Sequence, residues 1–161
     1  MPSMAWAGFR APIRQVCSLG FYNLHTGESL KTVYYENGRY VAGALQEINY
    51  VLRDFRANEV KPIDPRLLDL LVELRDQLGT TASYDVISGY RSPKTNAMLH
   101  SYSEGVAVHS LHVDGRAIDI RVLNRDLSTL HYAALSLRAG GVGYYPRSDF
   151  VHVDTGRIRR W

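Results

Sequence analysis

Apolar and polar residues alternate over two short segments near the start of this chain. The segment LGFYNLHTGESLKTVYY, residues 19–35, is typical of two strands joined by a turn at HTG, and ENGRY directly after it supplies a further Asn-Gly turn. Alternation places every second side chain on the same face of a strand, so each strand can bury one face. The pattern predicts a β-hairpin and another turn.

Three longer segments carry apolar residues three or four positions apart, as on one face of a helix. They are residues 42–56, 64–79 and 127–137. The second begins with Asp-Pro, which is typical of a helix N-terminus, and ends at a glycine, which is typical of a C-terminus. A shorter helix around Met98 is expected after the loop GYRSPKTN. The chain therefore has at least three amphipathic helices that can cover a sheet.

The second half of the chain also contains strand signals, at residues 84–88, 117–122, 140–146 and 149–156. Asp119 lies within the second of these segments. In the last one, Val151 and Val153 share one face while His152 and Asp154 share the other. Together the patterns predict a mixed α+β domain, with a central antiparallel sheet flanked by helices.

Length and composition are those of one globular domain. The chain has 161 residues, of which 45% are hydrophobic and 22% are charged. We expect residues 18–161 to form the folded domain. Residues 1–17 lack the long apolar core of a signal peptide, and we expect them to be a loosely ordered N-terminal extension.

The charge pattern bears on the possible partners. The formal net charge is +3, without a block of Lys and Arg and without an RNA-reading aromatic motif, so we predict no nucleic-acid partner. The mild positive charge is that of a solvated surface and can help the protein approach an anionic polymer. No run of about 18 apolar residues is present, so we predict no membrane span. The oligomeric state stays open.

Cysteine usage restricts the possible metal ligands. Cys17 is the only cysteine, which excludes an intramolecular disulfide and a cysteine-rich zinc ribbon. Any metal must therefore bind histidine and carboxylate side chains. Catalytic zinc sites commonly use three such ligands and leave the fourth position for water.

The segment HSLHVDGRAIDI, residues 109–120, offers candidates for such a site. His112 and Asp119 have six residues between them, and a turn at Gly115 can bring the loop imidazole back beside the strand carboxylate. His152 on the last strand can add a second imidazole. The spacing alone is a weak signal, because a polar loop running into a strand has the same pattern. His109 also competes, since a His-x-x-His pair can chelate a metal.

The same segments resemble a known family. The chain is similar to the YcbK/MepK-like murein endopeptidases, which belong to the D-Ala-D-Ala-type (VanX-like) zinc peptidases. Five segments fit that family in order, and the match covers roughly residues 18–161: FYNLHTGESL, IDPRLLDLL, ISGYRSPKTNAML, GVAVHSLHVDGRAIDIRV and GGVGYYPRSDFVHVDTGRIRRW. The resemblance implies a hedgehog/D-Ala-D-Ala-peptidase-like fold with one Zn²⁺ site at the sheet.

The resemblance also assigns the main site residues. The family's zinc ligands fall on His112, Asp119 and His152, and the position of His109 is not a ligand position in the family. The catalytic carboxylate, which takes the proton of the attacking water, falls on Asp149, where many relatives carry Glu. The arginine that polarises the substrate carbonyl falls on Arg91. Without the resemblance, Arg91 could equally pair with a surface carboxylate and Asp149 could equally cap a turn.

Three further residues are expected near the site. Ser110 matches a motif position that orients the loop or the substrate. Asp154 is expected behind His152, because imidazole ligands usually donate their second N–H to such a group. Tyr90 could line the cleft together with Tyr144 and Tyr145, although packing is an equally plain role for all three tyrosines.

These expectations define the functional hypotheses. The leading one is a zinc-dependent murein endopeptidase that cuts peptide cross-links at bonds to meso-diaminopimelate in peptidoglycan stems. The resemblance implies a periplasmic or cell-envelope location, although no signal peptide is visible. The alternatives are a zinc-containing cell-wall-binding module without catalysis, a D,D- or L,D-carboxypeptidase, and a purely structural domain.

Overall fold

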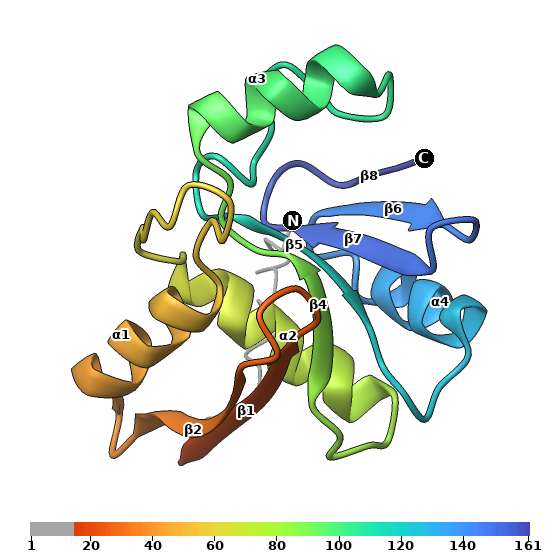
Figure 1. Ribbon diagram of the computed structural model, residues 1–161. Coiled ribbons are helices and arrows are strands. Elements are labelled where there is room, and N and C mark those ends of the chain that lie inside the picture. The colour runs from red at the N-terminus through yellow and green to blue at the C-terminus, as the bar shows by residue number, and fades with distance from the viewer. Residues whose placement is uncertain (1–14) are drawn as a thin grey trace, which may run out of the picture.

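The computed structural model describes residues 15–161 and has a mixed α+β fold, as the sequence predicts. Four helices surround one sheet of eight strands (Figure 1). The strands are β1 (Val16–Asn23), β2 (Ser29–Glu36), β3 (Arg39–Tyr40), β4 (Tyr84–Ser88), β5 (Ala117–Arg121), β6 (Gly141–Tyr145), β7 (Phe150–Asp154) and β8 (Arg159–Arg160). The helices are α1 (Ala42–Val51), α2 (Pro65–Gln77), α3 (Pro93–Tyr102) and α4 (Leu127–Leu137).

The sheet is mixed, which corrects the expectation of an antiparallel sheet. Its strand order is β3-β2-β1-β4-β5-β7-β6-β8. Most neighbours are antiparallel, but β1 pairs with β4 in parallel and β6 pairs with β8 in parallel. The reason lies in the connections. The chain between β1 and β4 includes α1 and α2 and returns to the same end of the sheet, and a crossover of that length permits parallel pairing.

The two faces of the sheet have different roles. On the face covered by α2 and α4, Ile118 and Ile120 of β5 are fully buried beside Val151 and Val153 of β7. Figure 1 shows both helices behind the sheet, with α3 at its upper end. Because side chains alternate along a strand, the residues between these apolar positions point to the opposite face. That opposite face carries the polar residues discussed below.

Helix α1 ends earlier than the apolar spacing indicates. It stops at Val51, whereas the sequence predicts a helix as far as Arg56. Tertiary contacts decide this end. The guanidinium of Arg53 forms a bidentate ion pair with Glu28, with both N–O distances 2.8 Å, and Asp54 forms a β-bridge with Glu59. A continuous helix would break both contacts.

The start of helix α2 follows the prediction. Asp64 caps α2 by accepting a hydrogen bond from the backbone N–H of Arg66, with Pro65 in the first turn. Strand β1 begins at Val16, so it includes part of the expected N-terminal extension, while residues 1–14 lie outside the described residues. Within residues 15–161, every helix is too short or too polar to cross a membrane.

Candidate metal centre

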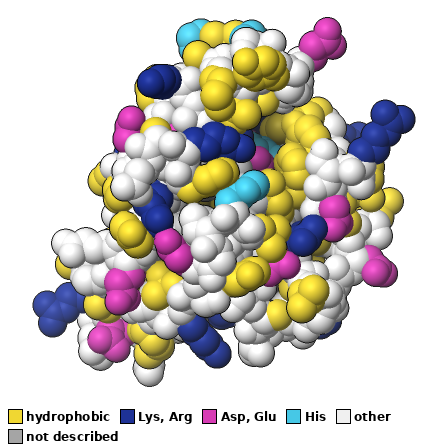
Figure 2. Space-filling view, in the orientation of Figure 1, with side chains coloured by type: hydrophobic (Ala, Val, Ile, Leu, Met, Phe, Trp, Pro, Cys, Tyr) yellow, Lys and Arg dark blue, Asp and Glu magenta, His cyan; other side chains and the backbone are white. Residues whose placement is uncertain are grey.

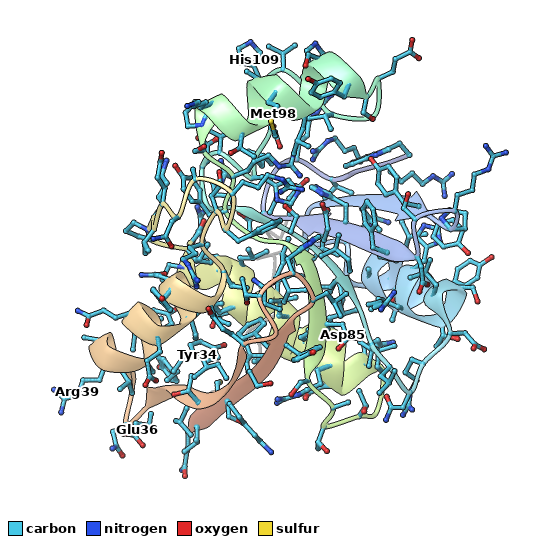
Figure 3. All side chains as sticks on the ribbon, in the orientation of Figure 1. Tyr34, Glu36, Arg39, Asp85, Met98 and His109 are labelled. Carbon is cyan, nitrogen blue, oxygen red and sulfur yellow. The ribbon has the colours of Figure 1, made fainter. Side chains whose placement is uncertain are left out.

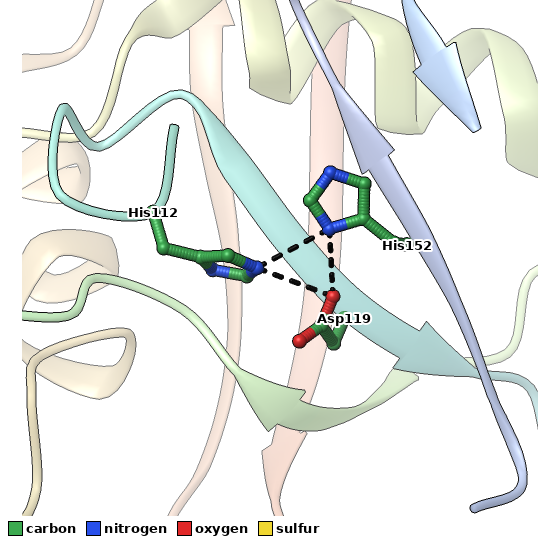
Figure 4. A group of neighbouring side chains, drawn as sticks. All are labelled: His112, Asp119 and His152. Carbon is green, nitrogen blue, oxygen red and sulfur yellow. Dashed lines mark hydrogen bonds and ion pairs between the residues drawn. The ribbon is translucent and has the colours of Figure 1, made fainter. Parts of the chain in front are cut away.

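Three buried side chains converge on the polar face of the sheet (Figure 4). His112 Nε2 lies 3.2 Å from Asp119 Oδ1 and 3.2 Å from His152 Nδ1, and the last two atoms are 2.9 Å apart. In tetrahedral zinc sites with His and carboxylate ligands, neighbouring ligand atoms are about 3.3 Å apart. Among residues 15–161, no other three His, Cys, Asp or Glu side chains come this close together.

Two local features bring these residues together. The loop before β5 turns back at Gly115, whose φ is +67°, and a Cβ there would lie 2.5 Å from the carbonyl oxygen of Pro62. This turn returns His112 to the strand that carries Asp119. Strands β5 and β7 then pair in a register that places Asp119 directly opposite His152. The turn expected at the glycine is therefore observed.

The second nitrogen of each imidazole already has a hydrogen-bond partner. His112 Nδ1 lies 2.7 Å from the carbonyl oxygen of Gly89, and only a ring N–H can donate to it. His152 Nε2 lies 2.8 Å from Asp154 Oδ2, which fits the expected position of Asp154 behind this ligand. Asp154 is completely buried.

These partners fix the chemistry of the three converging atoms. If each imidazole is neutral, His112 Nε2, His152 Nδ1 and Asp119 Oδ1 all present lone pairs to the same point, with no donor among them. Three acceptors within 3.2 Å of one another require a cation between them. The donor set therefore fits a metal ion with His and carboxylate ligands.

Without a metal, a proton on His152 supplies part of the positive charge between these atoms. Burial lowers the pKa of His152, but its hydrogen bonds to Asp119 and Asp154 and their negative charges together raise it to about 9. Burial raises the pKa of Asp119, yet the charges and hydrogen bonds of His112 and His152 hold it well below its usual range. A metal that binds at neutral pH must displace this proton from His152.

Arg91 lies next to the triad. One Nη atom lies 3.7 Å from Asp119 Oδ2, the oxygen that faces away from the imidazoles, and the other Nη donates to Asn96. Arg91 is 8% exposed, and its Nε has no hydrogen-bond partner within the part of the chain that the structure describes. Burial lowers its pKa, but a guanidinium stays charged at any working pH. Its backbone N–H donates to the carbonyl oxygen of His112, which ties the Arg91 loop to the ligand loop.

Ser110 and Tyr90 occupy supporting positions. The hydroxyl of Ser110 accepts a hydrogen bond of 3.3 Å from the backbone N–H of His112, so it holds the turn that carries this ligand. Tyr90 is 8% exposed, packs in the core and does not line the cavity at the triad. Tyr144 stacks on His131, whereas Tyr145 does line that cavity.

Asp149 is close to the site but is not among the cavity-lining residues. It precedes β7 with a left-handed backbone, φ +55°, and its side chain is 61% exposed. Its carboxylate accepts a hydrogen bond of 2.8 Å from Arg121, which by strand alternation lies on the same face as Asp119. Both neighbours of Asp149 in sequence, Ser148 and Phe150, line the cavity.

The cavity beside the triad has a volume of about 270 Å³. Figure 2 shows a hollow below α3 in which histidine and acidic atoms are visible. Its lining combines the 103–111 segment with the aromatic side chains of Tyr145, Phe150 and Trp161. His109 also lines it, but it is exposed, lies beside α3 in Figure 3 and is not part of the triad.

Two cavity residues were missed by the sequence interpretation. Arg159 forms a bidentate ion pair with Asp154, with N–O distances of 3.0 and 2.8 Å. The Trp161 ring lies 5.2 Å from the His152 ring, and its indole N–H donates to the Tyr145 hydroxyl. One sequence feature could have indicated these two residues: Gly141 and Gly143 alternate within the segment GGVG. Glycine inside a strand often indicates close approach by another group.

Comparisons with known proteins identify the family of this chain. A family model described as peptidoglycan L,D-endopeptidase MepK matches residues 11–161. The proteins of that name from Escherichia coli (strain K12) and Shigella flexneri are each 47% identical over 161 residues, which is 100% of this chain and 87% of theirs. A probable peptidoglycan L,D-endopeptidase MepK from Haemophilus influenzae is 43% identical over 144 residues, covering 89% of this chain and 77% of that protein. No solved structure matches. The chain therefore belongs to the family of M15 peptidases described as peptidoglycan L,D-endopeptidase MepK.

Proposed function

We propose that this protein is a zinc-dependent endopeptidase that hydrolyses peptide cross-links of bacterial peptidoglycan. The observation that carries the proposal is the set of three buried acceptor atoms at 2.9–3.2 Å, open to a cavity, in a member of a peptidoglycan endopeptidase family. The site is of the hedgehog/D-Ala-D-Ala-peptidase type, with its metal at the sheet.

The donor set favours zinc over other metals. Two imidazoles and one carboxylate with an open fourth position are typical ligands of catalytic Zn²⁺ in peptidases, whereas Mg²⁺ and Ca²⁺ prefer oxygen ligands. His112 Nε2, Asp119 Oδ1 and His152 Nδ1 would hold the ion. When bound, Zn²⁺ would lower the pKa of a coordinated water to about 7 and would polarise a carbonyl group.

Arg91 stabilises the negative charge that develops on the scissile carbonyl oxygen. Its guanidinium is buried, keeps its charge and is held in place by Asn96 and Ser88. A preorganised donor of this kind contributes roughly 10²–10³ in rate, because it needs no reorganisation during the reaction. Its third contact, with Asp119 Oδ2, keeps the guanidinium beside the proposed metal ligands.

Asp149 accepts the proton of the attacking water and transfers it to the leaving amine. Its position at the edge of the cavity supports this role, since Ser148 and Phe150 on either side of it line the cavity. In the structure its carboxylate is paired with Arg121. Its side chain is 61% exposed, so it is free to change rotamer, and it leaves Arg121 to reach the water. A positioned general base contributes about 10²–10⁴ in rate.

The substrate is the cross-linked peptide stem. The names of the relatives specify an L,D bond in peptidoglycan, and we infer cleavage at bonds to meso-diaminopimelate. Charged groups at the cavity suit a substrate with carboxylates, because Arg91 and Arg159 line it, while Asp119 is the only acidic side chain among the lining residues within 15–161. Such a substrate places the protein in the periplasm or cell envelope.

Digestion of purified sacculi tests the proposal. The zinc-loaded protein should convert cross-linked muropeptides into monomers, and chelation followed by zinc addition should abolish and restore the release. Loss of only a terminal D-amino acid from monomers would indicate a carboxypeptidase. Binding to sacculi without any release would indicate a cell-wall-binding module.

A further inference from the structure

The short edge strand β8 reaches the metal centre across a strip of glycines. Strand β8 pairs with β6, with Arg159 beside Gly141, and β6 in turn pairs with β7, with Gly143 opposite His152. Gly141 and Gly143 therefore lie on the same face of the sheet as the metal ligands. Larger side chains at these two positions on β6 would occupy the space in which the side chains of Arg159 and Trp161 approach β7.

The space beside both glycines is occupied by side chains from the C-terminal segment, Arg159 of β8 and Trp161 directly after it. A Cβ at Gly141 would lie 2.7 Å from Cζ of Arg159 and 2.5 Å from Asp154 Oδ2. A Cβ at Gly143 would lie 2.7 Å from Cε2 of Trp161. Real Cβ atoms essentially never lie closer than 3.0 Å, so a Cβ at either position would displace Arg159 or Trp161 from its present place. Because these glycines have no side chains, Arg159 can reach the carboxylate of Asp154 behind His152.

The carboxylate of Asp154 is held from every side. Oδ1 accepts from the backbone N–H groups of Gly141 and Gly156 at 3.0 and 2.8 Å, and Oδ2 accepts from His152 Nε2 at 2.8 Å. The two Nη atoms of Arg159 donate to both oxygens. A planar guanidinium that binds both oxygens fixes the plane of the carboxylate, and a single ammonium cannot do so.

We propose that Arg159 is a positioning residue of the metal centre, which fixes the ring of His152 through Asp154. This inference rests on the proposed function, because it assumes that His152 Nδ1 binds the metal. Arg159 itself forms no hydrogen bond or ion pair with His112, Asp119 or His152. It orients the Asp154 carboxylate, and this carboxylate determines the direction in which Nδ1 of His152 points.

Zinc affinity is the readout that separates positioning from packing. The dissociation constant for Zn²⁺ is measured by competition with a chelator, and the unfolding temperature of the metal-free protein is measured alongside. Groups that orient a ligand typically contribute 10–100-fold in metal affinity. We expect Arg159→Ala to weaken Zn²⁺ binding by about 10-fold or more. Arg159→Lys keeps the charge but loses the planar guanidinium that binds both carboxylate oxygens, so it should weaken Zn²⁺ binding by about 3-fold or more.

Two comparisons complete the experiment. Arg160→Ala removes the same charge from the exposed neighbour on β8 and should leave Zn²⁺ binding within about twofold of the wild type. The double variant Arg159→Ala/Asp154→Asn should bind Zn²⁺ as weakly as Asp154→Asn alone, because the two residues act in one chain of contacts.

The outcomes separate this inference from the proposed function. Unchanged Zn²⁺ affinity in Arg159→Ala or Arg159→Lys, or an equal loss in Arg160→Ala, would overturn the role of Arg159 even if the wild type cleaves cross-links. If the Arg159 variants lose affinity but the wild type cleaves nothing, the inference holds and the peptidase function fails. If Arg159→Ala does not fold, the Lys variant decides. A wild type that binds no Zn²⁺ overturns both.

Discussion

Raising the pH should destabilise the metal-free protein in a defined range. His152 is buried between the carboxylates of Asp119 and Asp154. Burial disfavours its charged form, but the two carboxylates outweigh this effect and raise its pKa from 6.5 to about 9. The folded protein therefore holds a proton on His152 at a pH where the unfolded chain has released it.

The size and sign of the effect follow from this difference. A pKa difference of one unit corresponds to about 1.36 kcal/mol, so the rise from 6.5 to about 9 amounts to about 3 kcal/mol of folding stability. Because the folded-state pKa is raised, this stability is complete below pH 6.5, declines from there upward and is absent above about pH 9. The pKa values of Asp119 and Asp154 are lowered, so their contributions are lost only in acid.

Urea unfolding of the metal-free protein at pH 6 and pH 9.5 measures the decline. In His152→Gln, whose side chain does not titrate, most of this decline in folding stability with pH should disappear. His131→Gln is the matched control, because burial and Arg160 lower the pKa of His131. Replacing His131 should therefore leave the decline in folding stability with pH unchanged. In the same range, Zn²⁺ should bind about tenfold more tightly per pH unit, since one proton is displaced. Equal stability of the wild type at both pH values would refute this account of the site.

Three further predictions concern the metal and the chemistry. His112→Ala should abolish stoichiometric zinc binding while His109→Ala retains it, as metal analysis will show, and the reverse result would move the ligand to His109. Chelation should remove activity but leave the circular dichroism spectrum largely intact, because the apolar core does not depend on the triad; cooperative unfolding on adding chelator would contradict this. Asp149→Asn should keep the zinc content and lower cleavage of cross-linked muropeptides by about 100-fold or more, and full activity of this variant would mean that another residue is the base.

The convergence of His112, Asp119 and His152 was predicted from the resemblance, and local sequence features explain much of it. A glycine between His112 and Asp119 permits the turn, and alternation on β7 places His152 and Asp154 on one face. Only the register of β5 with β7 was needed to complete the triad. The position of Asp154 behind His152 followed from the same alternation and from the usual second hydrogen bond of an imidazole ligand.

Other features depend on contacts between distant residues and could not be predicted from local patterns. The apolar spacing continues past Val51, but the ion pair of Arg53 with Glu28 ends the helix there. The parallel pairing of β1 with β4 and of β6 with β8 depends on how the chain crosses over, which alternation does not report. Arg159 was missed for a different reason: it lies only five residues after Asp154 but reaches it across β6, and alternation along one strand does not report such a contact.

We infer that the metal held by His112, Asp119 and His152 carries out the cleavage of peptidoglycan cross-links. The most direct measurement is a titration of the metal-free protein with Zn²⁺ while the release of monomers from purified cross-linked muropeptide dimers is followed. We predict no release without metal, a linear rise and a plateau at one Zn²⁺ per chain, and no activity of His152→Ala at any zinc concentration. Full activity of the metal-free protein, or no release at any zinc concentration, would contradict the account.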